Sequence, residues 1–176
     1  MVKLSGVLFI LAAIASTNAA VLYRRAPTGG LNVTVESEQL FCSFLPKTQG
    51  ETIGASESDA VPYCTQANPP NAPGATAFPD GFIKTAHFVT TDTYVQVTGT
   101  MDITKFGLDP TDGGGQYDNQ GDGSPPGALC TGYEKFVNLV EPDDGIYCIR
   151  CCKNPDECDT GKSTEGCRTV IPGDYS

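Results

Sequence analysis

Residues 135–152 read KFVNLVEPDDGIYCIRCC, and this stretch decides the fold of the chain. Two apolar runs, 135–140 and 146–151, lie on either side of a Glu-Pro-Asp-Asp-Gly segment. Pro, Asp and Gly adopt the backbone conformations that a tight reversal of the chain needs, so the pattern predicts a β-hairpin. The second run also carries cysteines, which connect the hairpin to the covalent framework of the chain.

Further strands follow from apolar–polar alternation on the N-terminal side of this hairpin. Segment 94–103 alternates Val, Met and Ile with Gln, Thr and Asp, which is typical of a strand with one buried face. Segment 83–89 is its expected partner, and segment 39–46 is a short strand that ends at a proline. No long amphipathic helix is recognisable. We therefore predict a mostly β fold, either a small disulfide-stapled β-sandwich or an irregular β domain with long Gly/Pro-rich loops.

Residues 1–19 have the pattern of a cleaved signal peptide. Lys3 supplies a positive charge, residues 6–15 are apolar, and small residues precede the expected cleavage after Ala19. This apolar run is too short to cross a bilayer as a stable helix, so cleavage is favoured over anchoring. The C-terminus lacks the hydrophobic tail of a GPI signal. We expect a soluble extracellular protein that is not bound to a membrane.

A dibasic pair, Arg24-Arg25, ends a short leader at residues 20–25. The pair suits late secretory processing, which would make the leader a propeptide, and it equally suits two solvated arginines in a frayed terminus. Residues 26–39 are predicted to be a polar N-terminal arm. Residues 40–176 are predicted to be a single disulfide-rich domain, because a chain of this length can build one core.

The N-terminal arm contains the sequon Asn32-Val33-Thr34. In an exported eukaryotic chain, Asn32 is therefore the expected acceptor of an N-linked glycan on exposed backbone.

The chain contains eight cysteines, and an even number behind an export signal is typical of a disulfide framework. Zinc binding uses similar spacings, but an oxidising secretory route favours pairing of the thiols. Adjacent Cys151 and Cys152 should project to opposite faces of a strand and tie it to two different elements. We expect all eight cysteines to pair, with local closure favoured in the tail: Cys42, Cys64, Cys130, Cys148, Cys151, Cys152, Cys158 and Cys167.

Acidic residues outnumber basic ones. The formal net charge is −10 for the whole chain and −13 beyond residue 25. Nucleic acids and anionic lipids are bound through clustered cations, so this balance argues against both as partners. Tryptophan is absent, while 20 glycines and 13 prolines indicate a loop-rich fold whose modest core needs disulfides.

Two long loops between the cysteines, 67–81 and 109–127, are the expected functional surfaces. The first is rich in proline, which favours polyproline II and turns at the surface. The second spaces carboxylates among glycines, so Asp112, Asp118 and Asp122 are weak candidates for calcium ligands. The match to an EF-hand fails at the twelfth position, where a leucine stands in place of the required Glu. A solvated turn is therefore favoured, and no metal or cofactor is expected.

No catalytic motif is recognisable. His87 is the only histidine, and its strand-like context predicts a half-buried structural role. A serine-nucleophile elbow is absent, and paired cysteines leave no free thiol. A pair from Asp112, Asp118 and Asp122 could still act in polysaccharide hydrolysis. Four tyrosines could stack on sugars, although core or turn positions are favoured for them: Tyr94, Tyr117, Tyr133 and Tyr147.

Six short motifs and a closing Pro-Gly-Asp-Tyr occur in order along residues 40–176: FCSFLP at 41–46, YCT at 63–65, PDGFI at 79–83, AHF at 86–88, YVQVTG at 94–99 and GGGQYD at 113–118. Together they resemble fungal secreted cysteine-rich proteins described as macrophage-activating-glycoprotein-like. The resemblance implies a fungal source and secretion, and it transfers no catalytic residues. Longer members carry a Ser/Thr-rich tail, which this chain lacks, so we expect free release rather than tethering.

We therefore expect a secreted fungal protein, effector-like or wall-associated, that acts by binding and is not an enzyme. Its expected partner is cell-wall polysaccharide or a host surface protein. The alternatives are a polysaccharide hydrolase that uses Asp carboxylates and a purely structural wall protein.

Overall fold

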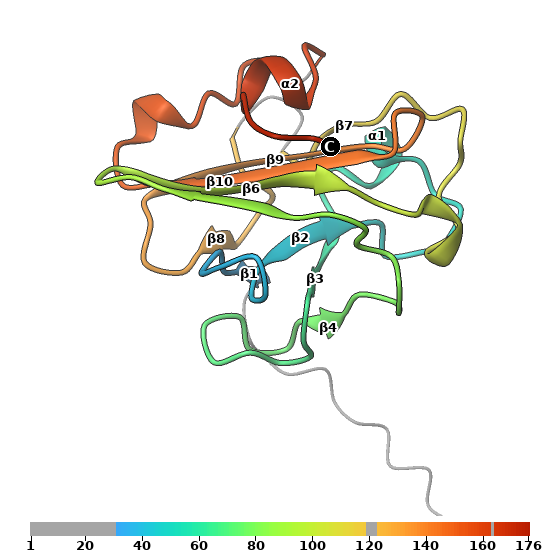
Figure 1. Ribbon diagram of the computed structural model, residues 1–176, viewed down its shortest axis with the longest axis horizontal. Coiled ribbons are helices and arrows are strands. Elements are labelled where there is room, and N and C mark those ends of the chain that lie inside the picture. Colours follow the sequence, from blue (N-terminus) through green and yellow to red (C-terminus); the bar gives the residue numbers. More distant parts are fainter. Residues whose placement is uncertain (1–30, 119–122, 163) are drawn as a thin grey trace, which may run out of the picture.

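A computed structural model describes residues 31–118, 123–162 and 164–176 of the chain (Figure 1). The predicted signal peptide and the processing residues Ala19, Arg24 and Arg25 lie outside these described residues. The described chain is mostly β and has few helices, as the sequence predicts.

The strands form three sheets. The largest has the order β5 (His87–Thr90), β6 (Tyr94–Thr100), β10 (Ile146–Cys152), β9 (Lys135–Glu141) and β7 (Gly115–Gln116), with every neighbouring pair antiparallel. A second sheet contains β2 (Cys42–Leu45), β3 (Val61–Cys64) and β4 (Thr76–Ala77). The third pairs β1 (Leu31–Val33) in parallel with β8 (Ala128–Cys130). The helices are short: α1 (Ile53–Ser56), α2 (Cys167–Val170) and the 3-10 turns η1 (Ile103–Lys105) and η2 (Pro155–Glu157).

The molecule has three layers, with the five-stranded sheet in the middle (Figure 1). The two smaller sheets lie against one face, and the main core fills the space between them and the central sheet. The C-terminal segment with α2 covers the other face and forms a separate C-terminal core there. The inner strands β6, β9 and β10 are therefore buried on both faces, while the edge strand β5 stays partly exposed.

The hairpin predicted over 135–151 is confirmed. β9 and β10 pair antiparallel from Glu141↔Ile146 to Lys135↔Cys152. The reversal uses Gly145 with a positive φ of 63°, a conformation that glycine adopts without steric cost. Because β10 lies between β6 and β9, this hairpin organises the whole central sheet.

The strand predicted over 94–103 begins at the correct residue, but it ends earlier than predicted and its polar side chains are buried. β6 ends at Thr100, and the Asp102 side chain then caps η1 by accepting from the Thr104 N–H at 3.1 Å. Gln96 and Thr98, expected to face solvent, are only 2% and 1% exposed. Carbonyls of the C-terminal segment accept hydrogen bonds from both side chains, and Arg150 of β10 donates to the Gln96 Oε1 at 2.8 Å. No local pattern in the strand indicates partners so distant in sequence.

The boundary predicted between an arm at 26–39 and a domain starting at 40 does not separate two structural units. β1 pairs with β8, and Val33 and Val35 are buried in the main core. The described part of the arm therefore belongs to the domain. The sequence pattern that indicates a strand here is only two valines spaced for one face, and polar residues surround them, so the segment resembles a polar arm.

All eight cysteines form disulfides: Cys42–Cys64, Cys130–Cys151, Cys148–Cys167 and Cys152–Cys158. Two of these four close within the tail, as expected. Adjacent Cys151 and Cys152 belong to the main core and the C-terminal core respectively. The prediction that they tie one strand to two elements on opposite faces is confirmed.

A row of aromatic rings fills the main core. Tyr147 stacks on Phe41 at 5.7 Å between centroids, and Phe41 lies 5.9 Å from Phe78. The row continues from Phe78 to Phe82 at 5.5 Å and from Phe82 to Phe106 at 5.9 Å. Large rings thus supply the core volume that a chain without tryptophan needs.

A buried amide joins the central sheet to the three-stranded sheet. The Asn138 side chain on β9 is 0% exposed. Its Oδ1 accepts from the Phe44 N–H at 2.7 Å, and its Nδ2 donates to the Cys148 carbonyl at 2.8 Å and to the Ser43 hydroxyl at 3.0 Å. The amide therefore satisfies backbone groups on two other strands, β2 and β10.

Replacing this amide should destabilise the fold. Asn138→Ala removes the hydrogen-bond acceptor of the buried Phe44 N–H and the side-chain donor to the Cys148 carbonyl of β10. We therefore expect the free energy of unfolding to fall by about 2–4 kcal/mol. Asn71→Ala, which removes one exposed hydrogen bond to Glu36, is the matched control and should cost less than about 1 kcal/mol. Denaturant unfolding of the oxidised proteins measures both. Equal losses in the two variants would contradict the role of Asn138.

Candidate functional site

The Pro-rich segment 67–81 is a loop held in place by its own hydrogen bonds. The Asn68 N–H donates to the Ala75 carbonyl at 2.8 Å, and the Asn68 Oδ1 accepts from the Gly74 N–H at 2.8 Å. The segment then forms β4, which pairs in parallel with β3. Four of its residues are buried: Pro69, Ala72, Ala75 and Phe78. The loop therefore presents a fixed surface.

A small open pocket lies where this loop returns to the core. Its volume is about 180 Å³. Ordinary small-molecule sites start at about 300 Å³, so this pocket fits a single ring or side chain of a larger partner. An aromatic ring and a proline supply apolar surface, while a hydroxyl and a carboxylate supply hydrogen-bonding groups. The lining residues are Thr65, Phe78, Pro79, Asp80, Gly81 and Ile83.

The aromatic row of the main core extends from this pocket to Tyr63. The Tyr63 ring centroid lies 6.3 Å from that of Phe78 and packs edge-on against Phe106 at 5.2 Å. Tyr63 is partly exposed, and its partial burial raises the pKa of its hydroxyl. Sequence reasoning named the loop 67–81 as a functional surface but did not identify the pocket or Tyr63, because the pocket also needs Thr65 and Ile83, which lie outside that loop.

The four tyrosines considered for sugar stacking occupy different surroundings. Tyr117 and Tyr147 are buried in the main core, and burial raises the pKa of both hydroxyls. Tyr94 carries the Arg150 guanidinium 4.4 Å from its ring centroid, and Tyr133 packs against the main core. These tyrosines do not form one platform.

Carboxylates of the Gly/Asp-rich loop make contacts within the fold. Asp112 accepts from the Ile53 N–H at 2.8 Å through Oδ2 and from the Gly114 N–H at 2.9 Å through Oδ1. Hydrogen bonds from the backbone N–H and the hydroxyl of Thr111 lower the pKa of Asp109. Both side chains act as turn and helix caps here.

The structure brings a further acid, Glu57, close to Asp118. Glu57 Oε1 lies 3.7 Å from the position that a Cβ on Gly115 would take, so it packs against β7. Partial burial, and then the negative charge of Asp118, raise the pKa of Glu57. Asp118 itself is 2% exposed and accepts from the Gln116 amide at 3.1 Å. No sequence spacing indicated this pair of acids.

The three calcium candidates are not placed together by the described residues. Asp112 and Asp118 make the contacts given above, and Asp122 lies outside the described residues. In the part of the chain that the structure describes, no group of three or more His, Cys, Asp and Glu side chains could hold a metal ion.

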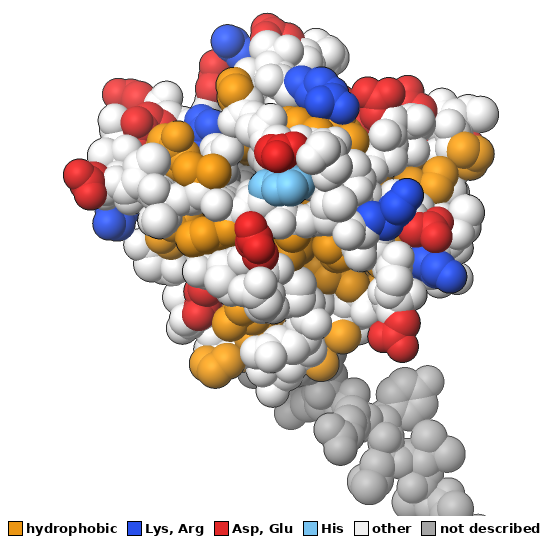
Figure 2. All heavy atoms as spheres, in the orientation of Figure 1, with side chains coloured by type: hydrophobic (Ala, Val, Ile, Leu, Met, Phe, Trp, Pro, Cys, Tyr) orange, Lys and Arg blue, Asp and Glu red, His pale blue; other side chains and the backbone are white. Residues whose placement is uncertain are grey.

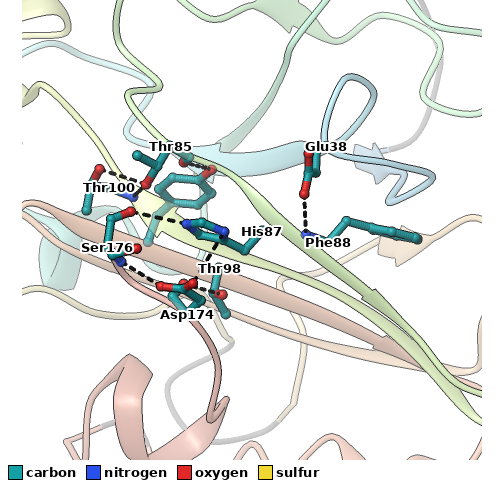
Figure 3. A network of polar contacts seen from close by, with 9 residues as sticks. Glu38, Thr85, His87, Phe88, Thr98, Thr100, Asp174 and Ser176 are labelled. Carbon is teal, nitrogen blue, oxygen red and sulfur yellow. Dashed lines mark hydrogen bonds and ion pairs between the residues drawn. The ribbon is translucent and has the colours of Figure 1, made fainter.

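His87 contacts the C-terminal segment (Figure 3). Its Nε2 lies 3.1 Å from the Ser176 carbonyl oxygen and its Nδ1 lies 3.6 Å from Asp174 Oδ2. Hydrogen bonds from Ser176, with a smaller effect of His87, lower the pKa of Asp174. The Asp174 carbonyl also accepts from the Thr98 hydroxyl at 2.6 Å. The side chain of His87 is 32% exposed, and its contacts position this segment on the sheet.

The face that carries the histidine shows charges of both signs scattered among uncharged side chains (Figure 2). Large hydrophobic side chains exposed within the described residues are Val89 at 41% and Leu129 at 45%. No described helix has the length and apolar character needed to cross a membrane.

Comparison with known proteins finds relatives in a fungus. The chain is similar to two fungal appressorium proteins. Appressorium protein ROW1 of Mycosarcoma maydis is 32% identical over 157 residues, which cover 80% of this chain and 36% of the relative. Appressorium protein ROW2 of the same fungus is 34% identical over 140 residues, which cover 70% of this chain and 45% of the relative. The chain thus spans less than half the length of these relatives.

No family model and no solved structure matches the chain. The fungal relatives agree with the predicted fungal origin. Neither carries the name of the macrophage-activating-glycoprotein-like family, so that narrower resemblance is not supported by these two matches.

Asp112 tests whether the acidic loop serves folding or metal binding. Asp112→Ala leaves two N–H groups without their acceptor, so we expect the free energy of unfolding to fall by about 1–3 kcal/mol. The loss should be the same in calcium and in EDTA, since both carboxylate oxygens already accept hydrogen bonds. Thermal unfolding of the wild type and the variant in both buffers measures this. A calcium-dependent rise in Tm that the variant loses would overturn the assignment.

Proposed function

We propose that the chain is a secreted, non-catalytic binding protein of the fungal surface, and that its partner is cell-wall polysaccharide. The observation that supports this most directly is the pocket at the end of the Pro-rich loop. It combines the Phe78 ring and Pro79 with the Thr65 hydroxyl and the Asp80 carboxylate. Sugar rings present one apolar face and a rim of hydroxyls, and this lining offers groups complementary to both.

The size and shape of the pocket favour a polymer over a free small molecule. A cavity of about 180 Å³ cannot enclose a typical small ligand, but an open pocket of this kind can take one unit of a chain. The loop is already ordered by its hydrogen bonds, so less conformational entropy is lost on binding. A host surface protein that inserts one side chain is the competing partner.

Secretion is supported by the disulfide framework and by the signal-peptide pattern of residues 1–19. The names of the relatives place those proteins in the appressorium, and we extend this location to the present chain. Action outside the cell, at the wall or the host surface, follows from combining the two. The macrophage-activating-glycoprotein-like resemblance is compatible with this proposal and remains a prediction.

A polysaccharide hydrolase is the second candidate, and one observation favours it. Partial burial, and then the negative charge of Asp118, raise the pKa of Glu57, and two neighbouring carboxyl groups in unequal surroundings are the arrangement that glycoside hydrolysis uses. Asp118 is almost fully buried, however, so substrate would have little access to it. Binding without catalysis therefore remains the proposal.

The binding site is tested by removing its polar groups. Thr65→Val with Asp80→Ala should weaken sedimentation with insoluble wall polysaccharides, such as β-glucan or chitin, by about tenfold or more, which corresponds to about 1.4 kcal/mol. Asp80 is exposed, whereas the Thr65 hydroxyl also donates to the Gln39 carbonyl at 2.7 Å and accepts from the Phe41 N–H at 3.4 Å. Near-UV circular dichroism therefore checks that the fold survives, and the single variant Asp80→Ala should show weakened binding by itself. Asp92→Ala, in the exposed turn after β5, is the matched control and should bind like the wild type. Equal binding by both variants, or binding only to host surface protein, would contradict the proposal.

The hydrolase candidate is tested with a panel of soluble glycans. We expect no turnover by the wild type. Turnover that is lost in Glu57→Gln and in Asp118→Asn, but kept in Asp109→Asn, would establish the enzyme and overturn the proposal of binding alone. Reducing-end release after long incubation measures it.

A further inference from the structure

Asn32 lies on the outward side of β1. Neighbouring residues of a strand point to opposite faces. Val33 is fully buried and faces the main core, so the side chain of Asn32 points away from that core. Asn32 is accordingly partly exposed.

The neighbour of Asn32 across the β1–β8 pair is an exposed leucine. The parallel register places Asn32 opposite Leu129 and Val33 opposite Cys130. Cys130 is buried with Val33, whereas Leu129 is 45% exposed, so Asn32 and Leu129 share the outward face. Leu129 therefore presents apolar side-chain surface directly beside the sequon asparagine, within reach of the first sugars of a glycan attached there.

We propose that Asn32 carries an N-linked oligosaccharide and that this oligosaccharide covers Leu129. Three observations support it: the sequon Asn32-Val33-Thr34, the outward orientation of Asn32, and the exposed leucine directly across the strand pair. A glycan linked to the Asn32 side chain starts next to Leu129 and extends over β8. The modification then serves solubility rather than partner recognition at the pocket.

The chemical step is a group transfer with a defined donor. The side-chain amide nitrogen of Asn32 forms a bond to the anomeric carbon of an oligosaccharide carried on a lipid pyrophosphate. The bond between that carbon and the pyrophosphate oxygen breaks, the pyrophosphate leaves with the electron pair, and the amide nitrogen loses one proton. No oxidation or reduction occurs.

The fold also sets when the transfer takes place. Thr34 is 3% exposed, and its hydroxyl donates to Glu36 Oε1 at 2.9 Å. The backbone of residues 31–33 is paired with β8. Because the sequon hydroxyl is buried in the folded domain, the sugar is added before β1 docks onto β8. The folded domain then keeps the glycan outside, on the face of Leu129.

Mass spectrometry of the full chain secreted from yeast tests the modification. We expect a peptide N-glycosidase to remove a glycan from the wild type and convert Asn32 to Asp, and Asn32→Gln to lack this mass change. Asn71→Gln, an exposed asparagine outside any sequon, is the matched control and should keep the glycan. A wild type without glycan at Asn32 would overturn the proposal.

The covering of Leu129 is tested on the folded, secreted wild type, so that poor folding of a variant does not obscure the result. Enzymatic removal of the glycan should increase apolar-dye binding and self-association at high concentration. Leu129→Ser should abolish this increase, while Val89→Ser, at the other exposed hydrophobic residue, should not. An increase that survives Leu129→Ser, or no increase on deglycosylation, would overturn the covering role.

Discussion

The buried amide of Asn138 is the interaction on which the arrangement of the layers depends. It holds the Phe44 N–H of β2 and the Cys148 carbonyl of β10 from one position on β9. A polar group in a dry core is tolerated only when it is fully paired, so it admits one relative placement of the two sheets. The Phe44 ring then stacks on Phe136 at 5.6 Å. The disulfide Cys130–Cys151, between β8 and β10, adds a covalent link between layers.

The central hairpin could be predicted from local sequence, but the C-terminal segment that covers the sheet could not. Segment 135–152 contains both strands and the turn residues, so every determinant lies within one short window. The burial of Gln96 and Thr98 depends on carbonyls of Pro172 and Asp174, which accept from their side chains at 3.0 and 2.6 Å. From the sequence, the polar residues of β6 look solvent-exposed, because their partners lie far away in the chain, at Arg150, Pro172 and Asp174.

The candidate sites also differ in whether the local sequence indicates their role. Carboxylates spaced among glycines suggested metal ligands, yet Asp112 serves as an acceptor for backbone N–H groups at α1 and in its own loop. Gly-rich loops need such caps because their backbone has few regular partners. The pocket, in contrast, joins Thr65 after β3 to residues 78–83. A site built from two segments in this way has no spacing for a sequence motif to report.

One disulfide and two hydrogen bonds connect the loop that carries the pocket to the rest of the fold. Cys130–Cys151 ties β8 to β10, and Thr131, next to Cys130, donates from its hydroxyl to the carbonyl of Asn71 in the Pro-rich loop. The Asn71 amide in turn donates to Glu36 Oε1 at 2.9 Å, beyond β1. Asn71 of the loop is thus held by one residue that follows β8 and by another that follows β1. Because its conformation is set by the folded chain, a partner meets a surface whose ordering entropy is lost during folding rather than during binding.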